Sequence, residues 1–274
     1  MTGLPTRAEG DWARGLPARA ARSMIVRGVF GPLVGAFGHP TVSGLENLHG
    51  LEPPFIVAAN HSSHMDTPAL LLALPPRLRR RTLVVAAADY FYKNRLVGGL
   101  VSLSLGTVPL DRKRGGAESI GTIEQLLAEG WAVLAFPEGS RTRDGRLHRG
   151  KTGIARLATS AQVPVLPVGI QGTFEALPHG RRLPRRAAVE VRFGKPLRFD
   201  HYLDRPVDRF VLRSITDEIM YEIMMLSEQV YVDEYASASP KPSPAHATPA
   251  PKQEAAVEAR SGAPQGSPPG PLQS

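Results

Sequence analysis

The chain has 274 residues, 42% of them hydrophobic, which is enough for one domain with a sizeable core plus terminal segments. Its formal net charge of +8 and its pI of about 10.1 favour an anionic partner, which can be nucleic acid, lipid headgroups or a phosphorylated substrate. The chain has no cysteine, which excludes disulfides, thiolate metal sites and a cysteine nucleophile, and fits a reducing, intracellular compartment.

The N-terminal region does not resemble a cleaved secretory signal, because residues 1–22 carry charges and no continuous apolar stretch. The next segment, Met24–Phe37, is hydrophobic, but Arg27 and several glycines interrupt it. It therefore falls short of the roughly 18 to 20 apolar residues that a transmembrane helix needs. Two interpretations stay open: an interfacial helix with Arg19, Arg22 and Arg27 at headgroup level, or a helix packed on the domain's own core.

Short apolar runs alternate with helical patterns between residues 23 and 235, which predicts an α/β domain. Most of the predicted strands are rich in Val and unbroken, as expected for strands covered by helices on both faces. These strands are Phe55–Ala59, Leu83–Ala87, Thr107–Leu110, Ala132–Phe136, Val165–Ile170 and Val189–Phe193. Amphipathic periodicity predicts helices at Ala117–Glu129, at Thr152–Ala161 and from Val211 to Val230. We expect a mixed, mostly parallel open sheet flanked by helices, with an N-terminal helical segment that faces a membrane.

The C-terminal residues 236–274 are rich in Pro, Ala, Ser and Gly and show no apolar periodicity. Such a composition cannot bury enough surface to offset the entropy of ordering the chain. The sequence thus predicts three parts: a flexible segment over residues 1–22, a folded domain over 23–235 and a disordered tail over 236–274.

The stretch Asn60-His61-Ser62-Ser63-His64-Met65-Asp66 directly follows a predicted strand, where functional groups commonly lie. If a helix begins near Ser63, His61 lies just before it and Asp66 in its first turn, so the two side chains can meet. A carboxylate that holds one ring nitrogen of a histidine leaves the other as a general base, suited to removing a proton from an alcohol. The alternative is structural: Ser63 and Asp66 cap the helix, and His61 is an ordinary loop histidine.

Two further polar clusters follow predicted strands. In Phe136–Thr142, a Gly turn can bring Glu138 and Arg141 together, and an Arg can bind a phosphate bidentately. The alternative is a surface turn with a solvated ion pair. The segment Gly106–Arg112 places another Arg at a third strand end. Ligand crevices of open α/β sheets form at strand ends, so three such clusters together predict a binding site.

These stretches resemble the sequence blocks of the lysophosphatidic acid and glycerol-phosphate acyltransferase family. Asn60–Asp66 matches the N-H-x-S-x-x-D form of the family's H-x4-D motif, and Phe136–Arg141 matches its F-P-E-G-[ST]-R block. Gly106–Arg112 resembles the second block, which ends in Asp-Arg, and Val163–Val168 is similar to the fourth, proline-bearing block. The four blocks occur in the family's order over roughly residues 45 to 200, which makes the combination specific.

The resemblance implies a division of roles. His61 acts as the general base on a glycerol hydroxyl, Asp66 orients it, and the hydroxyl attacks a fatty acyl thioester without a covalent acyl-enzyme. The residues implied in binding the acceptor's phosphate and glycerol are Asp111, Arg112, Glu138, Gly139, Ser140, Arg141 and Lys151.

The resemblance also implies the reaction and the partners. We expect acyl transfer from acyl-CoA or an acyl carrier protein to lysophosphatidic acid, forming phosphatidic acid in phospholipid biosynthesis, with glycerol 3-phosphate or another lysophospholipid as alternative acceptors. No cofactor beyond the thioester co-substrate is expected. No metal is expected either, because histidines such as His148 and His179 lack ligand spacing. We expect an intracellular enzyme, peripheral on the cytoplasmic face of a membrane with an anionic surface.

Two competing interpretations rest on other motifs. Gly145–Thr152 fits the phosphate-loop pattern G-x4-G-K-T, but about eight mostly polar residues separate it from the preceding predicted strand. The basic runs Arg77–Arg81 and Arg181–Arg186 suit lipid headgroups and suggest a protein that only docks on membranes. Neither run is interleaved with aromatic residues, so no nucleic-acid partner is expected.

Overall fold

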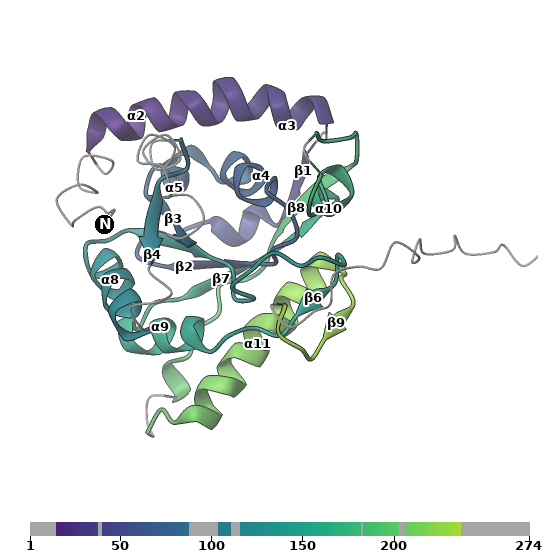
Figure 1. Ribbon diagram of the computed structural model, residues 1–274. Coiled ribbons are helices and arrows are strands. Elements are labelled where there is room, and N and C mark those ends of the chain that lie inside the picture. Colours follow the sequence, from purple (N-terminus) through teal and green to yellow (C-terminus); the bar gives the residue numbers. More distant parts are fainter. Residues whose placement is uncertain are drawn as a thin grey trace, which may run out of the picture. The chain divides into compact units, whose positions relative to one another are not determined.

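The computed structural model describes residues 15–37, 40–87, 104–110, 116–181, 183–202 and 206–236. Within these ranges the chain forms a seven-stranded mixed sheet of order β1-β8-β7-β2-β5-β3-β4 and a small two-stranded sheet, β6-β9 (Figure 1). The strands of the large sheet are β1 (Pro40–Ser43), β2 (Ile56–Ala59), β3 (Thr82–Ala87), β4 (Thr107–Leu110), β5 (Ala132–Ala135), β7 (Val165–Gln171) and β8 (Val189–Phe193).

The large sheet is mostly parallel, as predicted. Strands β7, β2, β5, β3 and β4 run in one direction, so their carboxyl ends share one edge of the sheet. Strand β8 pairs antiparallel with β7 and parallel with β1. All six predicted strands are present with ends that differ by at most one residue, whereas β1 was not predicted.

Each face of the sheet packs on its own set of helices. Along β2, Val57 and Ala59 point into one core cluster, while Ile56 and Ala58 point into the other, as the two-residue period of a strand requires. The first cluster includes α4 (Asp66–Ala73) and the second includes side chains of three later helices, on the opposite side of the sheet in Figure 1. These three helices are α8 (Gly116–Ala128), α9 (Gly153–Ala161) and α11 (Arg209–Ser227). The central strands are thus buried on both faces, as their Val-rich sequences indicate.

The N-terminal helical segment comprises α2 (Leu16–Ile25), a π-helical turn η2 (Val26–Phe30) and α3 (Gly31–Phe37). Val26 and Val34 are buried in the same core as α4. The side of the segment that carries these two residues therefore fits the interpretation of a helix packed on the domain's own core. Met24 and Val29 are 69% and 57% exposed, and their contact with a membrane stays a prediction. Within the described ranges, none of the helices combines the length and apolar composition that spanning a bilayer requires.

The interpretation that places Arg22 at headgroup level does not fit the structure, because the Arg22 side chain is buried. The guanidinium packs against Gly106 at the start of β4, where a Cβ atom would come within 2.7 Å of Arg22 Cζ. Burial, together with the charge of Arg19, lowers the pKa of Arg22 to about 10. Arg22 therefore joins the N-terminal helix to the sheet and is not available to lipid.

Two short strands connect the C-terminal part of the fold to the segment after β5. The helix α11 ends earlier than predicted, because Glu228 adopts a left-handed backbone conformation with φ of 54°. The chain then forms β9 (Tyr231–Val232), which pairs parallel with β6 (Leu147–His148). The remaining elements are short: η3 (Leu45–Leu48), α5 (Pro76–Arg79), α10 (Thr173–Ala176) and η4 (Asp200–Tyr202). Residues 1–14 lie outside the described ranges, as does all of the predicted tail 236–274 except Ala236, so the predicted domain boundaries stay predictions.

Candidate active site

The topology brings two of the three polar clusters together. Strands β2 and β5 are neighbours in the sheet and run parallel, with Ala58 opposite Ala135, so the segments that follow them meet at one edge. The third cluster follows β4, which is separated from β5 by β3. Asp111 and Arg112 lie outside the described residues, and their placement stays a prediction.

His61 and Asp66 form the predicted pair. The Nδ1 atom of His61 lies 2.8 Å from Oδ2 of Asp66, and the Asp66 side chain is fully buried at the first position of α4. The same Oδ2 accepts hydrogen bonds from the backbone N–H groups of Ser62 at 2.7 Å and Ser63 at 2.8 Å. The helix N-terminus favours a negative charge at this position. With Nδ1–H donated to the carboxylate, Nε2 of His61 is left as the proton acceptor.

The imidazole ring of His61 is held in place but stays accessible. It stacks on the ring of Phe136 with centroids 3.9 Å apart and planes 12° from parallel, and the His61 side chain is 19% exposed. The backbone of His61 is held on both sides, because its N–H donates to Oε1 of Glu138 at 2.8 Å and its carbonyl accepts from the Thr142 N–H at 2.8 Å. The segment after β5 therefore fixes the position of the histidine.

Both carboxyl oxygens of Glu138 accept hydrogen bonds from backbone N–H groups of the protein. It is almost fully buried, and its second oxygen, Oε2, accepts from the His148 N–H at 3.0 Å. Burial raises the pKa of Glu138 to about 8, against the opposing effect of the two backbone hydrogen bonds. The geometry thus gives Glu138 a positioning role toward His61, and the contact with substrate expected from the motif stays a prediction.

Gly139, Ser140 and Arg141 lie on the turn after β5, and Lys151, which follows β6, packs its side chain over that turn. Gly139 has φ of 73°, and the Lys151 side chain crosses over it so closely that a Cβ atom on Gly139 would come within 2.9 Å of Lys151 Nζ. The Lys151 N–H also donates to the Pro137 carbonyl at 2.8 Å. Burial and the neighbouring charges of Arg141 and His61 lower the pKa of His64 to about 4. The Lys151 ammonium thus lies against Gly139, and the positive charge of Arg141 acts on His64, three residues after His61.

Sequence reasoning missed a buried polar network behind this turn. His148, discussed only as a non-ligand of metals, is buried with Nε2 3.0 Å from Oδ1 of Asp144. Asp144 also accepts from the Thr142 hydroxyl at 2.5 Å, and despite partial burial its hydrogen bonds hold its pKa below the usual range. The sequence feature that could have indicated this contact is the four-residue spacing of Asp144 and His148. Among the described residues, no group of three or more His, Asp or Glu side chains is placed to bind a metal.

The phosphate-loop interpretation of Gly145–Thr152 does not match the backbone. Leu147 and His148 form the buried strand β6, and α9 begins only at Gly153. A phosphate loop should instead leave a strand directly and wrap its N–H groups around the anion.

The first basic run is largely structural. Arg77 donates to the backbone carbonyl of Leu48 at 2.6 Å and forms an ion pair with Glu52, while Arg79 is buried and donates to the Leu71 carbonyl at 3.3 Å. Arg81 also donates to the Gly130 carbonyl at 3.2 Å, so three of the four arginines of this run bond to backbone carbonyls of the fold.

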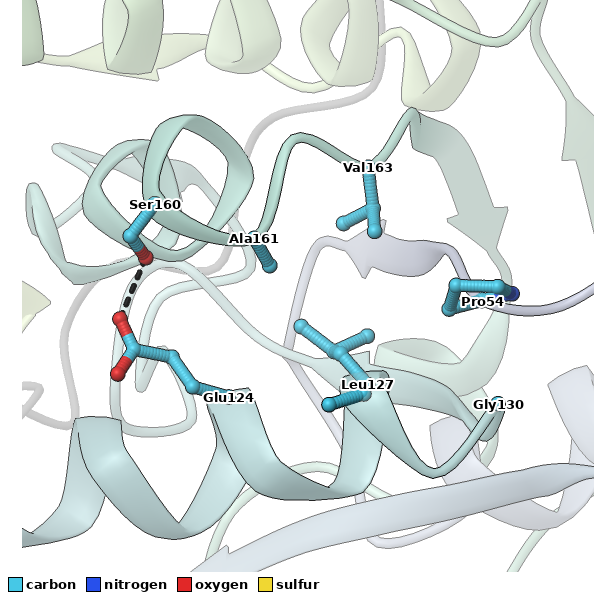
Figure 2. Close-up of a pocket in the computed structure, with 8 residues that line it drawn as sticks. Pro54, Glu124, Leu127, Gly130, Ser160, Ala161 and Val163 are labelled. Atoms are coloured by element: carbon cyan, nitrogen blue, oxygen red, sulfur yellow. Dashed lines mark hydrogen bonds between the residues drawn. The ribbon is translucent and has the colours of Figure 1, made fainter.

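An open groove of about 580 Å³ lies at the other edge of the sheet (Figure 2). Pro54, Gly130 and Val163, which line it, precede β2, β5 and β7, and Glu124 and Ser160 on its wall are hydrogen bonded. Among the described residues, none of the charged side chains of the sequence motifs lines this groove. The groove is thus separate from the His61 site at the carboxyl ends of the same strands.

The chain has clear relatives among known proteins. Residues 39–171 match the Acyltransferase family model. The chain is 31% identical over 159 residues, 57% of its length and 44% of the relative's, to a chloroplastic 1-acyl-sn-glycerol-3-phosphate acyltransferase of Brassica napus. It is 29% identical over 161 residues, 58% of its length and 74% of the relative's, to the 1-acyl-sn-glycerol-3-phosphate acyltransferase of Bacillus subtilis.

A solved structure shares the fold. The 1-acyl-sn-glycerophosphate acyltransferase PlsC from Thermotoga maritima matches with a TM-score of 0.58 and 25% sequence identity, over 81% of this chain and 84% of that one. The chain spans less than half the length of the Brassica napus relative.

Proposed function

We propose, from the match of residues 39–171 to the Acyltransferase family model, that the chain transfers a fatty acyl group from a thioester to the free hydroxyl of 1-acyl-sn-glycerol 3-phosphate. The observation that carries the proposal is the His61–Asp66 pair, with Nδ1 and Oδ2 2.8 Å apart, together with Arg141 on the turn after β5 and the Lys151 side chain that packs over Gly139 of that turn. Relatives named for the same acceptor support it.

The pair supports direct transfer. Nε2 of His61 takes the proton of the acceptor hydroxyl as its oxygen attacks the thioester carbonyl carbon. The carbon–sulfur bond then breaks, and the leaving thiolate takes the proton back from the imidazolium that Asp66 stabilises. No covalent acyl-enzyme is needed, in agreement with a chain that has no cysteine. General-base assistance contributes about 10²- to 10⁴-fold, so positioning of both substrates has to supply much of the remaining rate.

The charges around the pair suit a phosphorylated acceptor. The guanidinium of Arg141 can bind a phosphate bidentately, and Lys151, whose side chain packs over Gly139, adds a second positive charge. Because burial raises the pKa of Glu138 to about 8, its carboxyl group is mostly neutral near pH 7. It therefore adds little repulsion toward a phosphate or toward the buried carboxylate of Asp66.

The finer assignments belong to the same proposal. The donor is acyl-CoA or an acyl carrier protein, and the alternative acceptors are glycerol 3-phosphate and other lysophospholipids. The exposed side chains of Met24 and Val29 on the N-terminal helical segment support peripheral attachment to the cytoplasmic face of an anionic membrane.

A substrate matrix tests the proposal. The purified protein is given radiolabelled palmitoyl-CoA or palmitoyl carrier protein together with 1-acyl-sn-glycerol 3-phosphate, glycerol 3-phosphate or lysophosphatidylcholine, and the lipid products are separated. We expect phosphatidic acid as the main product. No product from any combination would refute the acyltransferase assignment, and preference for another acceptor would refute the specificity.

A further inference from the structure

Asn60, the first residue of the Asn60–Asp66 motif, is hydrogen bonded to the side-chain amide of Gln229, which lies outside the matched family region. Asn60 is buried at the end of β2, and its Oδ1 accepts from the Ile170 N–H at 2.8 Å while its Nδ2 donates to the Ile170 carbonyl at 2.7 Å. The second N–H of Nδ2 donates to Oε1 of Gln229 at 2.9 Å. Since the backbone of Ile170 fixes which end of the Asn60 amide is oxygen, the orientation of the Gln229 amide follows.

The other end of Gln229 reaches the segment after β5. Its Nε2 donates to the carbonyl of Gly145 at 2.7 Å. Gln229 thus joins the residue before His61 to the turn after Arg141 through one side chain, whose amide accepts at its oxygen and donates at its nitrogen. These partners are 169 and 84 residues away in the sequence.

Backbone pairing holds Gln229 in place. The adjacent Val230 accepts from the Leu147 N–H at 3.0 Å, and the Glu234 carbonyl accepts from the Arg149 N–H at 3.0 Å. The same Glu234 carbonyl lies 3.2 Å from Nδ1 of the buried His148. The stretch from 229 to 234 therefore runs along residues 145–149, which follow the turn of Arg141 in the chain.

We propose that Gln229 is a positioning residue of the active site, which sets the relative placement of the His61 turn and the Arg141 turn. The inference deepens the proposed function and rests on it for its kinetic part. Gln229 lies 58 positions beyond the end of the matched family region at residue 171, so the site is completed by a part of the chain that the family match does not include.

The test compares Gln229→Met with Gln125→Met in the full-length protein. Gln125 is a matched control, because its Nε2 donates to the nearby Glu129 at 3.0 Å on the exposed face of α8. For Gln229→Met we expect kcat to fall roughly tenfold, with the KM of the thioester donor changed by less than about twofold, because the misplaced groups act in the transition state. The control is expected to keep the wild-type kcat.

Hydrogen–deuterium exchange supplies a measurement that does not depend on activity. In Gln229→Met we expect faster exchange in peptides over residues 56–66 and 139–149, with peptides over 116–128 unchanged. In Gln229→Glu, the acceptor for Asn60 is kept and only the donor to Gly145 is lost, so the increase is expected in 139–149 alone.

The outcomes separate the two claims. A wild-type protein without acyl transfer, combined with the local exchange increase, would refute the proposed function and support the positioning role. Unchanged kcat and exchange in Gln229→Met, or an increase spread evenly over the whole chain, would overturn the positioning role.

Discussion

The carboxylate oxygen Oδ2 of Asp66 lies 2.8 Å from Nδ1 of His61 and also accepts the N–H groups of the two residues after that histidine. One oxygen therefore orients the ring and also shapes the turn that carries it. In Asp66→Asn the amide oxygen can still accept these bonds, but the negative charge that stabilises the imidazolium is lost. We expect kcat to fall by roughly 10²-fold or more with the fold retained, measured by steady-state assay and circular dichroism. A variant within threefold of wild type would contradict the role of Asp66.

A contact between residues that are close in the sequence can be predicted from the sequence, whereas a contact between distant residues cannot. His61 and Asp66 are five residues apart, at a predicted strand end and a predicted helix start, so their contact could be predicted. Val-rich runs such as Val165–Gln171 likewise marked buried strands. Glu138, in contrast, bonds the backbone N–H of a residue 77 positions away. A backbone N–H group can belong to any residue type, so the sequence gives no sign of which one Glu138 binds. The motif around Glu138 therefore suggested a contact with substrate and not the hydrogen bond to the His61 N–H.

The buried carboxyl group of Glu138 predicts a pH-dependent stability. Its folded-state pKa of about 8 lies above its ordinary value of 4.5, so the protonated form is favoured in the folded protein. The stabilisation is complete below pH 4.5 and is lost as the pH rises through about 8. Between these values the unfolding free energy of wild type should fall with pH more steeply than that of Glu138→Gln, by up to about 1.4 kcal/mol per pH unit. Chemical denaturation of both proteins from pH 5 to 8 measures this, and parallel curves would refute the prediction.

Arg141 is predicted to bind the acceptor phosphate through its planar guanidinium. Arg141→Lys keeps the positive charge but loses the bidentate geometry. We expect the KM for 1-acyl-sn-glycerol 3-phosphate to rise roughly tenfold with kcat little changed, because the lost contact stabilises the ground state and the transition state alike. The KM for the thioester donor, measured in the same experiment, is the internal control. A change in the donor KM alone would place Arg141 at the other substrate.

The packing of α11 on β7 depends on Gly169. A Cβ atom there would come within 2.3 Å of the backbone carbon of Leu226, so Gly169→Ala forces the helix away from the strand. We expect a loss of about 1–3 kcal/mol in the free energy of unfolding. Gly121→Ala is the control, because nothing lies within 4 Å of that position in α8, and it should gain about 0.5–1 kcal/mol. Thermal and urea unfolding of both variants measure the difference, and equal effects would contradict the close packing.

The central claim is that His61 is the base for acyl transfer to a lipid hydroxyl. The most direct measurement is the rate at which purified wild type and His61→Ala transfer a radiolabelled palmitoyl group to 1-acyl-sn-glycerol 3-phosphate, with matching circular dichroism spectra. We predict that wild type forms phosphatidic acid and that His61→Ala is slower by roughly 10²-fold or more. A His61→Ala variant that works at the wild-type rate would contradict the account.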